Sequence, residues 1–284
     1  MVPWIFYITK TGSCYAAPLK GGILNMKQPN YGNWISKTMM QFLWTATVIF
    51  LALSLLFTYL FQVKILAATA VVLTILSAIL SVYHQVCRHA FSFTGRGVMS
   101  GIHSELLNHL SWNGNGTLLD IGCGSGALTI RCAKAFPKAE ITGIDYWGAQ
   151  WNYAKEQCEE NRQIEQVQPI TFIKGDAATL PFQSESFDAV ISNFVFHEVM
   201  TQPDKRKVVR EALRVVKKGG VFAFHDLFEQ KILYGDIKAL VEELKKEGIT
   251  EINYIPHTEN MKCIPFYAKA PWLLSGLGML YGVK

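Results

Sequence analysis

Two uncharged apolar runs in succession constrain the fold of this chain more than any other feature. Residues 38–63 contain no charged side chain, a single Lys64 follows, and residues 65–87 are again uncharged. As helices, residues 39–61 would be about 35 Å long and residues 65–83 about 28 Å long, against a hydrocarbon core of ~30 Å. The sequence therefore predicts a transmembrane helical hairpin over residues 39–87, with spans at about 39–61 and 65–83.

The flanking charges predict how this hairpin is oriented. Lys27 and Lys37 precede the first span, and Arg88 and Arg96 follow the second. Basic residues concentrate on the cytoplasmic side of a membrane, so both ends of the hairpin should face the cytoplasm, with Lys64 at the far interface. Small residues in the second span favour close helix packing: Ala67, Ala68, Ala70, Ser77, Ala78 and Ser81. The alternatives are a re-entrant pair that does not cross fully and two core helices of a soluble protein.

Composition supports a membrane protein with an ordered globular domain. Residues 1–104 hold seven Lys or Arg and no Asp or Glu, whereas the rest of the chain is slightly acidic. A basic, acid-free segment suits nucleic acid or an anionic membrane surface, and its apolar content favours the membrane. The rest lacks a basic stripe, so no nucleic-acid partner is expected. Six cysteines without a C-x-x-C motif predict neither a disulfide framework nor a metal site. The expected division is a basic segment over 1–38, the hairpin over 39–87, and a domain over 88–284.

After an amphipathic helix at about 97–110, short strands and helices alternate. Strands are expected at 117–121, 140–144, 170–173, 187–192 and 220–225, helices at 127–136, 147–162, 205–216 and 237–247, and a closing hairpin at 249–255 and 263–268. Alternation at this spacing predicts an α/β fold with a parallel sheet covered by helices on both faces. Such sheets bind ligands at the carboxyl ends of their strands.

A glycine-rich loop and three acids stand at those carboxyl ends. Gly122–Gly126 follows the first strand directly, Asp120 precedes the loop, Asp145 closes the second strand, and Asp176 follows the third. Glycines let a ligand approach the backbone, and the start of the next helix offers free N–H groups to a carboxylate. The acids can accept from an ammonium group, two ribose hydroxyls and an adenine amino group. One ligand that carries an amino acid, a ribose and an adenine would satisfy all three.

Five motifs in order resemble those of the class I S-adenosylmethionine-dependent methyltransferases, closest to the ubiquinone/menaquinone methyltransferase-like (type 11) group. They are DIGCGSG, GIDYW, GDAATLPF, FDAVISNFVFHEV and EALRVVKKGG, and Met99–His103 echoes a segment upstream of the glycine loop in that group. The resemblance covers residues 97–270. It implies a Rossmann-like seven-stranded sheet of order 3-2-1-4-5-7-6 with an antiparallel last strand. An NAD-type Rossmann unit is the alternative, but it prefers G-x-G-x-x-G.

The resemblance also implies a cofactor site for S-adenosyl-L-methionine. Its residues would be Asp120, Gly122, Cys123, Gly124 and Gly126 around the methionine part, Asp145 at the ribose, Tyr146, Asp176 and Ala177 around the adenine, and Asn193 nearby. Turn geometry for the glycines and helix or turn capping for the acids are the structural alternatives.

Two His–acid pairs are the candidate catalytic residues. His197-Glu198 follows the fourth strand and His225-Asp226 ends the fifth, where an acceptor would lie. Histidine titrates near neutral pH and suits proton transfer, although packing, capping or a salt bridge would account for these residues as well. Quinone methyltransferases of the group carry an Arg-Asn pair at His197-Glu198. The acceptor therefore stays open between a lipid amine, a phenol or quinone carbon, and another amphiphile.

The hairpin favours an acceptor that partitions into the bilayer. The expected function is a membrane-bound methyltransferase of a hydrophobic or lipid-like small molecule, with its catalytic domain on the cytoplasmic side. The alternatives are an anchored methyltransferase of a protein or soluble metabolite, and a non-catalytic cofactor-binding module. The apolar stretch at 270–284 is expected to close over the acceptor, rest on the membrane, or pack at the sheet edge.

Overall fold

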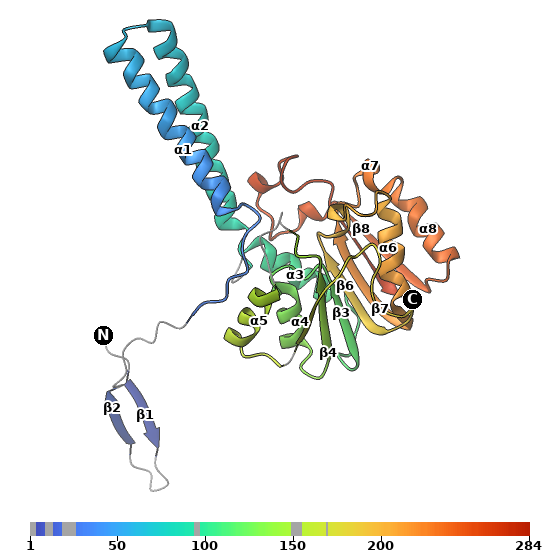
Figure 1. Cartoon of the computed structure of the whole chain (residues 1–284). Helices are drawn as coiled ribbons and strands as arrows, with labels where there is room; N and C mark the ends of the chain where they lie inside the picture. Colours follow the sequence, from blue (N-terminus) through green and yellow to red (C-terminus); the bar gives the residue numbers. More distant parts are fainter. Residues whose placement is uncertain (1–3, 9–13, 19–26, 94–96, 149–154, 169) are drawn as a thin grey trace.

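A long helical hairpin and a sheet domain make up most of the chain (Figure 1). The computed structural model describes residues 4–8, 14–18, 27–93, 97–148, 155–168 and 170–284. Near the N-terminus, β1 (Trp4–Ile8) pairs antiparallel with β2 (Cys14–Pro18). The hairpin follows as α1 (Lys37–Leu55), continued by a π-helical segment (Leu56–Leu60), and α2 (Lys64–Ala90). The prediction of two apolar helices before the sheet is confirmed, and the second runs beyond the expected residue 83.

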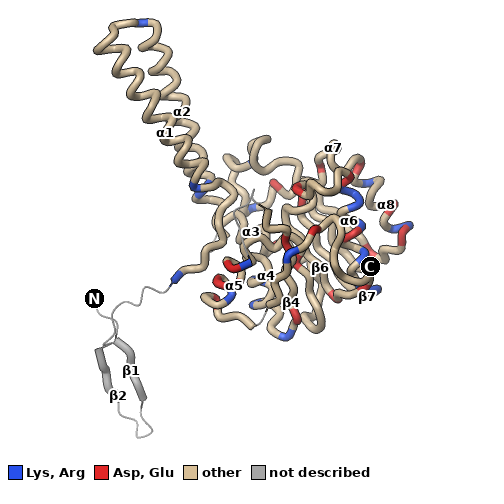
Figure 2. Tube along the Cα trace, viewed as in Figure 1, with Lys and Arg blue, Asp and Glu red and all other residues tan. Residues whose placement is uncertain are grey.

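The outer surface of the hairpin is apolar. Only 6% of the most apolar stretch of the first helix and 11% of that of the second is buried. Such low burial is the reverse of what a soluble core helix shows, so these helices are not core helices of the sheet domain. Figure 2 shows Lys and Arg at the base and at the turn of the hairpin, with an uncharged stretch between them. Both helices are long and apolar enough to cross a membrane.

Small and hydroxyl side chains hold the two helices together. Thr47 and Ser81 are buried at the interface, with their hydroxyl oxygens 3.2 Å apart. Ala70 is also buried there, and Ala67, Ser77 and Ala78 are half-buried. Ala68 faces outward instead. Most of the expected stripe of small residues therefore lies at or beside the contact, where it lets the backbones approach.

The domain contains a seven-stranded mixed sheet. Its strands are β3 (Thr117–Ile121), β4 (Glu140–Asp145), β5 (Ile170–Lys174), β6 (Phe187–Asn193), β7 (Val216–Asp226), β8 (Glu251–Pro256) and β9 (Gly278–Val283). Their order in the sheet is β5-β4-β3-β6-β7-β9-β8, which is the expected order 3-2-1-4-5-7-6. β9 runs antiparallel to both β7 and β8, whereas the first five strands are parallel. The predicted fold is confirmed.

Helices cover both faces of the sheet. One face carries α3 (Val98–Asn108), α4 (Ala127–Ala135) and α5 (Lys155–Ile164), and the other α6 (Lys205–Arg214), α7 (Lys231–Tyr234) and α8 (Ile237–Lys246). Adjacent residues of a strand point to opposite faces, and both faces are covered. Leu118 and Leu119 of β3 are therefore both fully buried, in separate hydrophobic clusters. Of the predicted helix at 147–162, residues 149–154 lie outside the described residues.

The closing hairpin was predicted with the wrong second strand. Residues 263–268 do not form a strand but contain a short 3-10 turn (Phe266–Ala268), and the partner of β8 is β9. The expectation that 270–284 forms a lid or a membrane rest is wrong for 278–283, which lie inside the sheet. A six-residue apolar run with two glycines fits there. A Cβ on Gly282 would lie 1.9 Å from the carbonyl oxygen of Glu251, so the neighbouring strand leaves room only for glycine.

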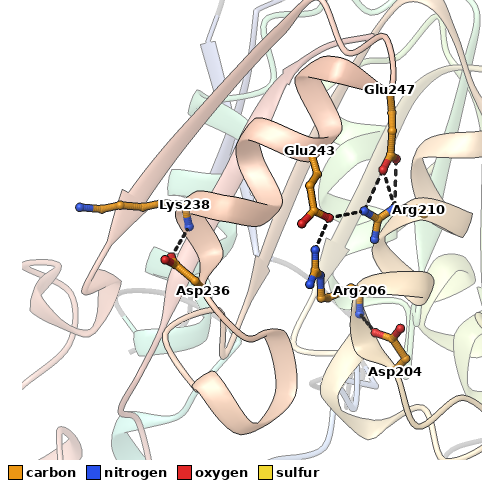
Figure 3. Close-up of polar contacts among 7 residues, drawn as sticks. All are labelled: Asp204, Arg206, Arg210, Asp236, Lys238, Glu243 and Glu247. Atoms are coloured by element: carbon orange, nitrogen blue, oxygen red, sulfur yellow. Dashed lines mark hydrogen bonds and ion pairs between the residues drawn. The ribbon is translucent and has the colours of Figure 1, made fainter.

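Ion pairs join the two helices α6 and α8 (Figure 3). The Arg210 guanidinium donates to both carboxylate oxygens of Glu247, at 2.8–3.0 Å, and to Glu243 at 2.8 Å. Arg206 also donates to Glu243. Exposed ion pairs contribute little singly, but a bidentate arginine within a network contributes more.

We expect Arg210→Met to lower the free energy of unfolding by about 1 kcal/mol at low salt, because it removes the central cation of this network. Thermal unfolding of the purified full chain in detergent, at two salt concentrations, measures the effect. Lys238→Met is the matched control, since in Figure 3 this residue of α8 bonds Asp236 through its backbone N–H (2.9 Å), whereas its side chain points away from the network. A loss for Arg210→Met that equals the control, or that does not shrink at high salt, would contradict the prediction.

Candidate active site and cofactor cavity

The glycine loop turns sharply between β3 and α4. The backbone N–H groups of Gly122 and Cys123 donate to the carbonyl oxygen of Ile144, which ties the loop to the end of β4. Gly122 has φ +73°, and a Cβ there would lie 2.1 Å from a methyl carbon of Val195. Only glycine fits this conformation and this close approach. The first turn of α4 thereby comes to the carboxyl ends of the strands.

A cavity of about 550 Å³ lies at these strand ends. Nine of the ten predicted cofactor residues line it: Asp120, Gly122, Cys123, Gly124, Asp145, Tyr146, Asp176, Ala177 and Asn193. The tenth, Gly126, is buried behind the loop, where a Cβ would meet the ring of Phe172 at 3.3 Å. The parallel strand order therefore brings together acids that stand far apart in the sequence.

Of the two acids nearest the loop, Asp120 is fully buried and Asp145 half-buried, and neither forms an ion pair with a residue that the structure describes. An Asp145 oxygen accepts from the N–H of Gly124 (2.8 Å), and its other oxygen accepts from that of Trp147 (2.7 Å). Burial raises the pKa of Asp145 despite these bonds. Asp120 accepts from the hydroxyl of Thr129 (2.6 Å), and burial raises the pKa of Asp120 to about 7, with the nearby Asp145 adding to the rise. A cationic group in the cavity would favour the charged form of Asp120.

Asp176 occupies a turn after β5. One of its oxygens accepts from the N–H of Ala178 (2.8 Å). Tyr146, which follows β4, is exposed and has the ammonium of Lys174 5.8 Å from its ring centroid. Asp176 and Tyr146 both line the cavity at the end away from β6.

His197 and Glu198 line the cavity on the other side, as expected from their position after β6. His197 lies between two carboxylates, with Nδ1 2.7 Å from Asp226 and Nε2 3.3 Å from Glu198. Burial alone would lower the pKa of His197, but the charges and hydrogen bonds of the two acids raise it to about 10. At neutral pH this side chain is therefore an imidazolium with both N–H groups engaged.

Asp226 and His225 lie behind the cavity lining, fully buried at the end of β7. Asp226 accepts from the N–H groups of Val195 (3.0 Å) and Phe196 (2.8 Å), so it fixes the loop that carries His197. Burial would raise its pKa, but His197 holds that pKa below its usual range.

His225 contacts Asn193 through Nδ1 (3.0 Å) and Thr258 through Nε2 (2.7 Å). Burial lowers the pKa of His225 to about 4, so at neutral pH it is a neutral link between two polar side chains.

Sequence reasoning missed part of the cavity lining. Trp34, Phe93, Met99, His103 and Met200 line the cavity as well, together with Phe194 of the loop after β6, where the sequence places an acceptor. Trp34 meets Phe194 edge to face, with ring centroids 4.5 Å apart, and burial lowers the pKa of His103 to about 3. Trp34 is compatible with an aromatic at a membrane interface, and Met99–His103 was noted without a role. Nothing in either pattern signals a shared cavity, because the fold brings together lining residues from Trp34 to Thr201 that no local pattern connects.

The chemistry of the donor set fits S-adenosylmethionine. The buried carboxylate of Asp120 lines the cavity where an ammonium can bind, the start of α4 lines it as well, and two further acids, Asp145 and Asp176, are among the lining residues. Among the residues that the structure describes, no group of three or more His, Cys, Asp or Glu side chains could hold a metal ion.

Known proteins match this part of the chain. Residues 119–224 match the family model of the methyltransferase domain. The arsenite methyltransferase of Rattus norvegicus is 33% identical over 158 residues, which are 51% of this chain and 42% of the rat protein. A demethylmenaquinone methyltransferase of Staphylococcus aureus (strain JH9) is 36% identical over 104 residues, 36% of this chain and 39% of that protein. The similarity thus spans about two fifths of the length of these curated relatives.

The phosphoethanolamine N-methyltransferase 2 of Haemonchus contortus, solved in complex with S-adenosyl-L-methionine, shares the fold. Its TM-score is 0.50 at 20% identity, over 64% of this chain and 52% of that one. The fold, the site and the matched segment together define an S-adenosylmethionine-dependent methyltransferase domain, and S-adenosylmethionine is its cofactor.

The raised pKa of Asp120 makes cofactor binding depend on pH. Binding of an ammonium group lowers this pKa, so affinity for S-adenosylhomocysteine should rise about tenfold from pH 5.5 to 7.5, below the ~8 at which an α-amino group loses its proton. Calorimetry at both pH values measures the affinity. Asp120→Asn should bind weakly with a flat profile, whereas the control Asp176→Asn should keep the slope. A wild-type affinity for S-adenosylhomocysteine that does not change with pH would contradict this prediction.

The His197–Asp226 pair should stabilise the fold more at pH 6 than at pH 9. The folded-state pKa of His197 is raised to about 10 from the ~6.5 of an unfolded histidine, so the stabilisation that His197 contributes is fully present at pH 6 and is lost as pH rises through 10. His197→Gln should therefore lower the free energy of unfolding by about 3 kcal/mol at pH 6 and by less at pH 9. Thermal unfolding at both pH values tests this, with the exposed His257→Gln as control. A difference that grows towards pH 9 would contradict the assignment.

Proposed function

We propose that this chain is a membrane-anchored methyltransferase that transfers the methyl group of S-adenosylmethionine to a hydrophobic, membrane-resident small molecule. One observation carries the choice of acceptor. Trp34 lies just before α1 and Phe93 just after α2, and both line the same cavity as the three acids. The two chain segments at the base of the apolar hairpin therefore form one wall of the site.

Asp120, Asp145 and Asp176 are the residues that would hold the ammonium, ribose and adenine of the cofactor. When bound, the cofactor supplies an electrophilic methyl carbon on a sulfonium. The acceptor would lie among Phe194, Trp34 and Phe93, whose rings exclude water. Methyl transfer is an in-line displacement, so the main task of the site is alignment.

Glu198 is our candidate for the residue that touches the acceptor, because its carboxylate lines the cavity. His197 is engaged by two carboxylates and does not serve as a base at neutral pH. It orients Glu198 and is itself oriented by Asp226. His225 positions Asn193. Of the four predicted catalytic residues, Glu198 would therefore contact the acceptor, and His197, His225 and Asp226 would be positioning residues.

For the hairpin, we propose a full crossing with both ends on the cytoplasmic side. Lys37 and Arg88 lie at its base, beside the sheet domain, and Lys64 starts α2 at the turn. In intact cells, a membrane-impermeant thiol reagent should label Lys64→Cys and not Lys37→Cys, and both should react after permeabilisation. Labelling of Lys37→Cys in intact cells, or of neither variant except after permeabilisation, would contradict this topology.

Transfer of labelled methyl from S-adenosylmethionine into membranes that contain the protein tests the activity. Label should enter the organic-extractable fraction and disappear with Asp120→Ala. Trp34→Ala should reduce that transfer about tenfold and leave affinity for S-adenosylhomocysteine unchanged, because Trp34 packs on Phe194 and not on the acids. Label found only in protein or water-soluble products would instead make the hairpin a simple anchor. Absence of any label, with S-adenosylhomocysteine still bound, would leave a non-catalytic binding module.

A further inference from the structure

The segment between β8 and β9, residues 257–277, exposes two large aromatic side chains. Phe266 is 84% exposed and Trp272 70% exposed. Aromatic rings of this size are normally at least half covered in a soluble domain. Lys262 is also exposed, and Lys269 is half-buried nearby. Glu259, the single acid of the segment, accepts from the N–H of Leu277 and is mostly buried.

This segment is fixed to the base of the hairpin. The hydroxyl of Tyr83 on α2 donates to the carbonyl oxygen of Tyr267, at 2.8 Å. Ile264, Ala268 and Leu274 are buried in one hydrophobic cluster with Cys87 and Phe91 from the end of α2 and the residue after it. Figure 1 shows the segment, in red, beside the base of the hairpin on the side from which the helices project. Phe266 and Trp272 are therefore held where a membrane crossed by the hairpin would begin.

We propose that residues 257–277 are a second membrane contact, in which Phe266 and Trp272 enter the headgroup region of the cytoplasmic leaflet. The proposal rests on the membrane hairpin proposed above. Aromatic rings favour this region of a bilayer, and lysines beside them are attracted to anionic lipids. The uncovered rings, the basic charge and the attachment to α2 all fit a lipid surface as the occupant.

This second membrane contact would hold the apolar end of the cavity next to the bilayer. Phe194 and Met99 line the cavity and belong to the same buried cluster as Ile264 and Leu274. Because this cluster packs the hairpin against the sheet domain, a second contact at 257–277 would fix the tilt of the whole molecule in the membrane and keep the apolar end of the cavity beside the lipid. Residues 257–277 would therefore affect the rate of methyl transfer to an acceptor in the membrane and would not affect cofactor binding.

A fluorescent amino acid at position 266 tests the contact directly. An environment-sensitive residue is placed by amber suppression at 266 or, as control, at 138 in the exposed turn before β4, at the amino ends of the parallel strands and away from the cavity. The full chain is reconstituted in vesicles with 30% anionic phospholipid and lipids quencher-labelled near the headgroup. We expect a blue shift and quenching at 266 and neither at 138. Equal, water-like emission at both positions would overturn the proposal.

The two proposals fail in different ways. If the hairpin does not cross the membrane, alkaline carbonate releases the protein from the vesicles. If the protein stays in the pellet and position 266 still reports water, the second contact is wrong and the hairpin stands.

Activity gives an independent readout. Phe266→Ser with Trp272→Ser should slow transfer to an acceptor in vesicles by about threefold or more, since binding at an interface scales with the apolar area that enters it. The rate with a detergent-solubilised acceptor and the affinity for S-adenosylhomocysteine should not change. Ile232→Ser on α7 removes an equally exposed apolar side chain and is the control. An equal loss in the control, or a loss that persists in detergent, would overturn the proposal.

Discussion

One hydrophobic cluster joins the three parts of this molecule. It contains Cys87 and Phe91 from the hairpin, Met99 from α3, Phe194 after β6, and Leu274 from the β8–β9 connection. These residues are distant in the chain, and burial of their side chains together is what fixes the hairpin against the sheet domain. Because Met99 and Phe194 also line the cavity, the same packing places the apolar end of the site at the hairpin base. The proposed acceptor and the proposed second membrane contact both depend on this cluster.

Buried carboxylates in this site behave in opposite ways, and their partners explain why. Asp120 has a hydroxyl for a partner and no cation, so burial raises its pKa and leaves it ready for a cationic ligand. Asp226 has His197 and three backbone N–H groups, so its pKa stays low and the pair is a permanent part of the structure. Asp120 is therefore suited to bind a cationic ligand, and Asp226 is suited to hold the loop that carries His197 in place.

Features carried by local patterns were predicted well. Long uncharged runs predict the two helices of the hairpin, and strand–helix alternation with Asp120, Asp145 and Asp176 at strand ends predicts where the cavity lies. The errors occur where an apolar run had several possible places. From sequence alone, residues 278–283 could form a lid, a segment resting on the membrane, or a strand, because a short apolar run has no periodicity that distinguishes these three structures. Their place between β7 and β8 is set by pairing with both strands.

The sequence by itself determined most of the element types, the acid at the end of each of three strands, and the apolar hairpin, since each of these follows from residues within one element or its neighbour. Only the tertiary structure decided which side chains meet. It placed Trp34 on Phe194, His197 between Asp226 and Glu198, and Tyr267 beside Tyr83 of α2. The physical reason is that such contacts depend on the packing of whole elements. A pattern in sequence records which residues prefer burial, and not which partner covers them.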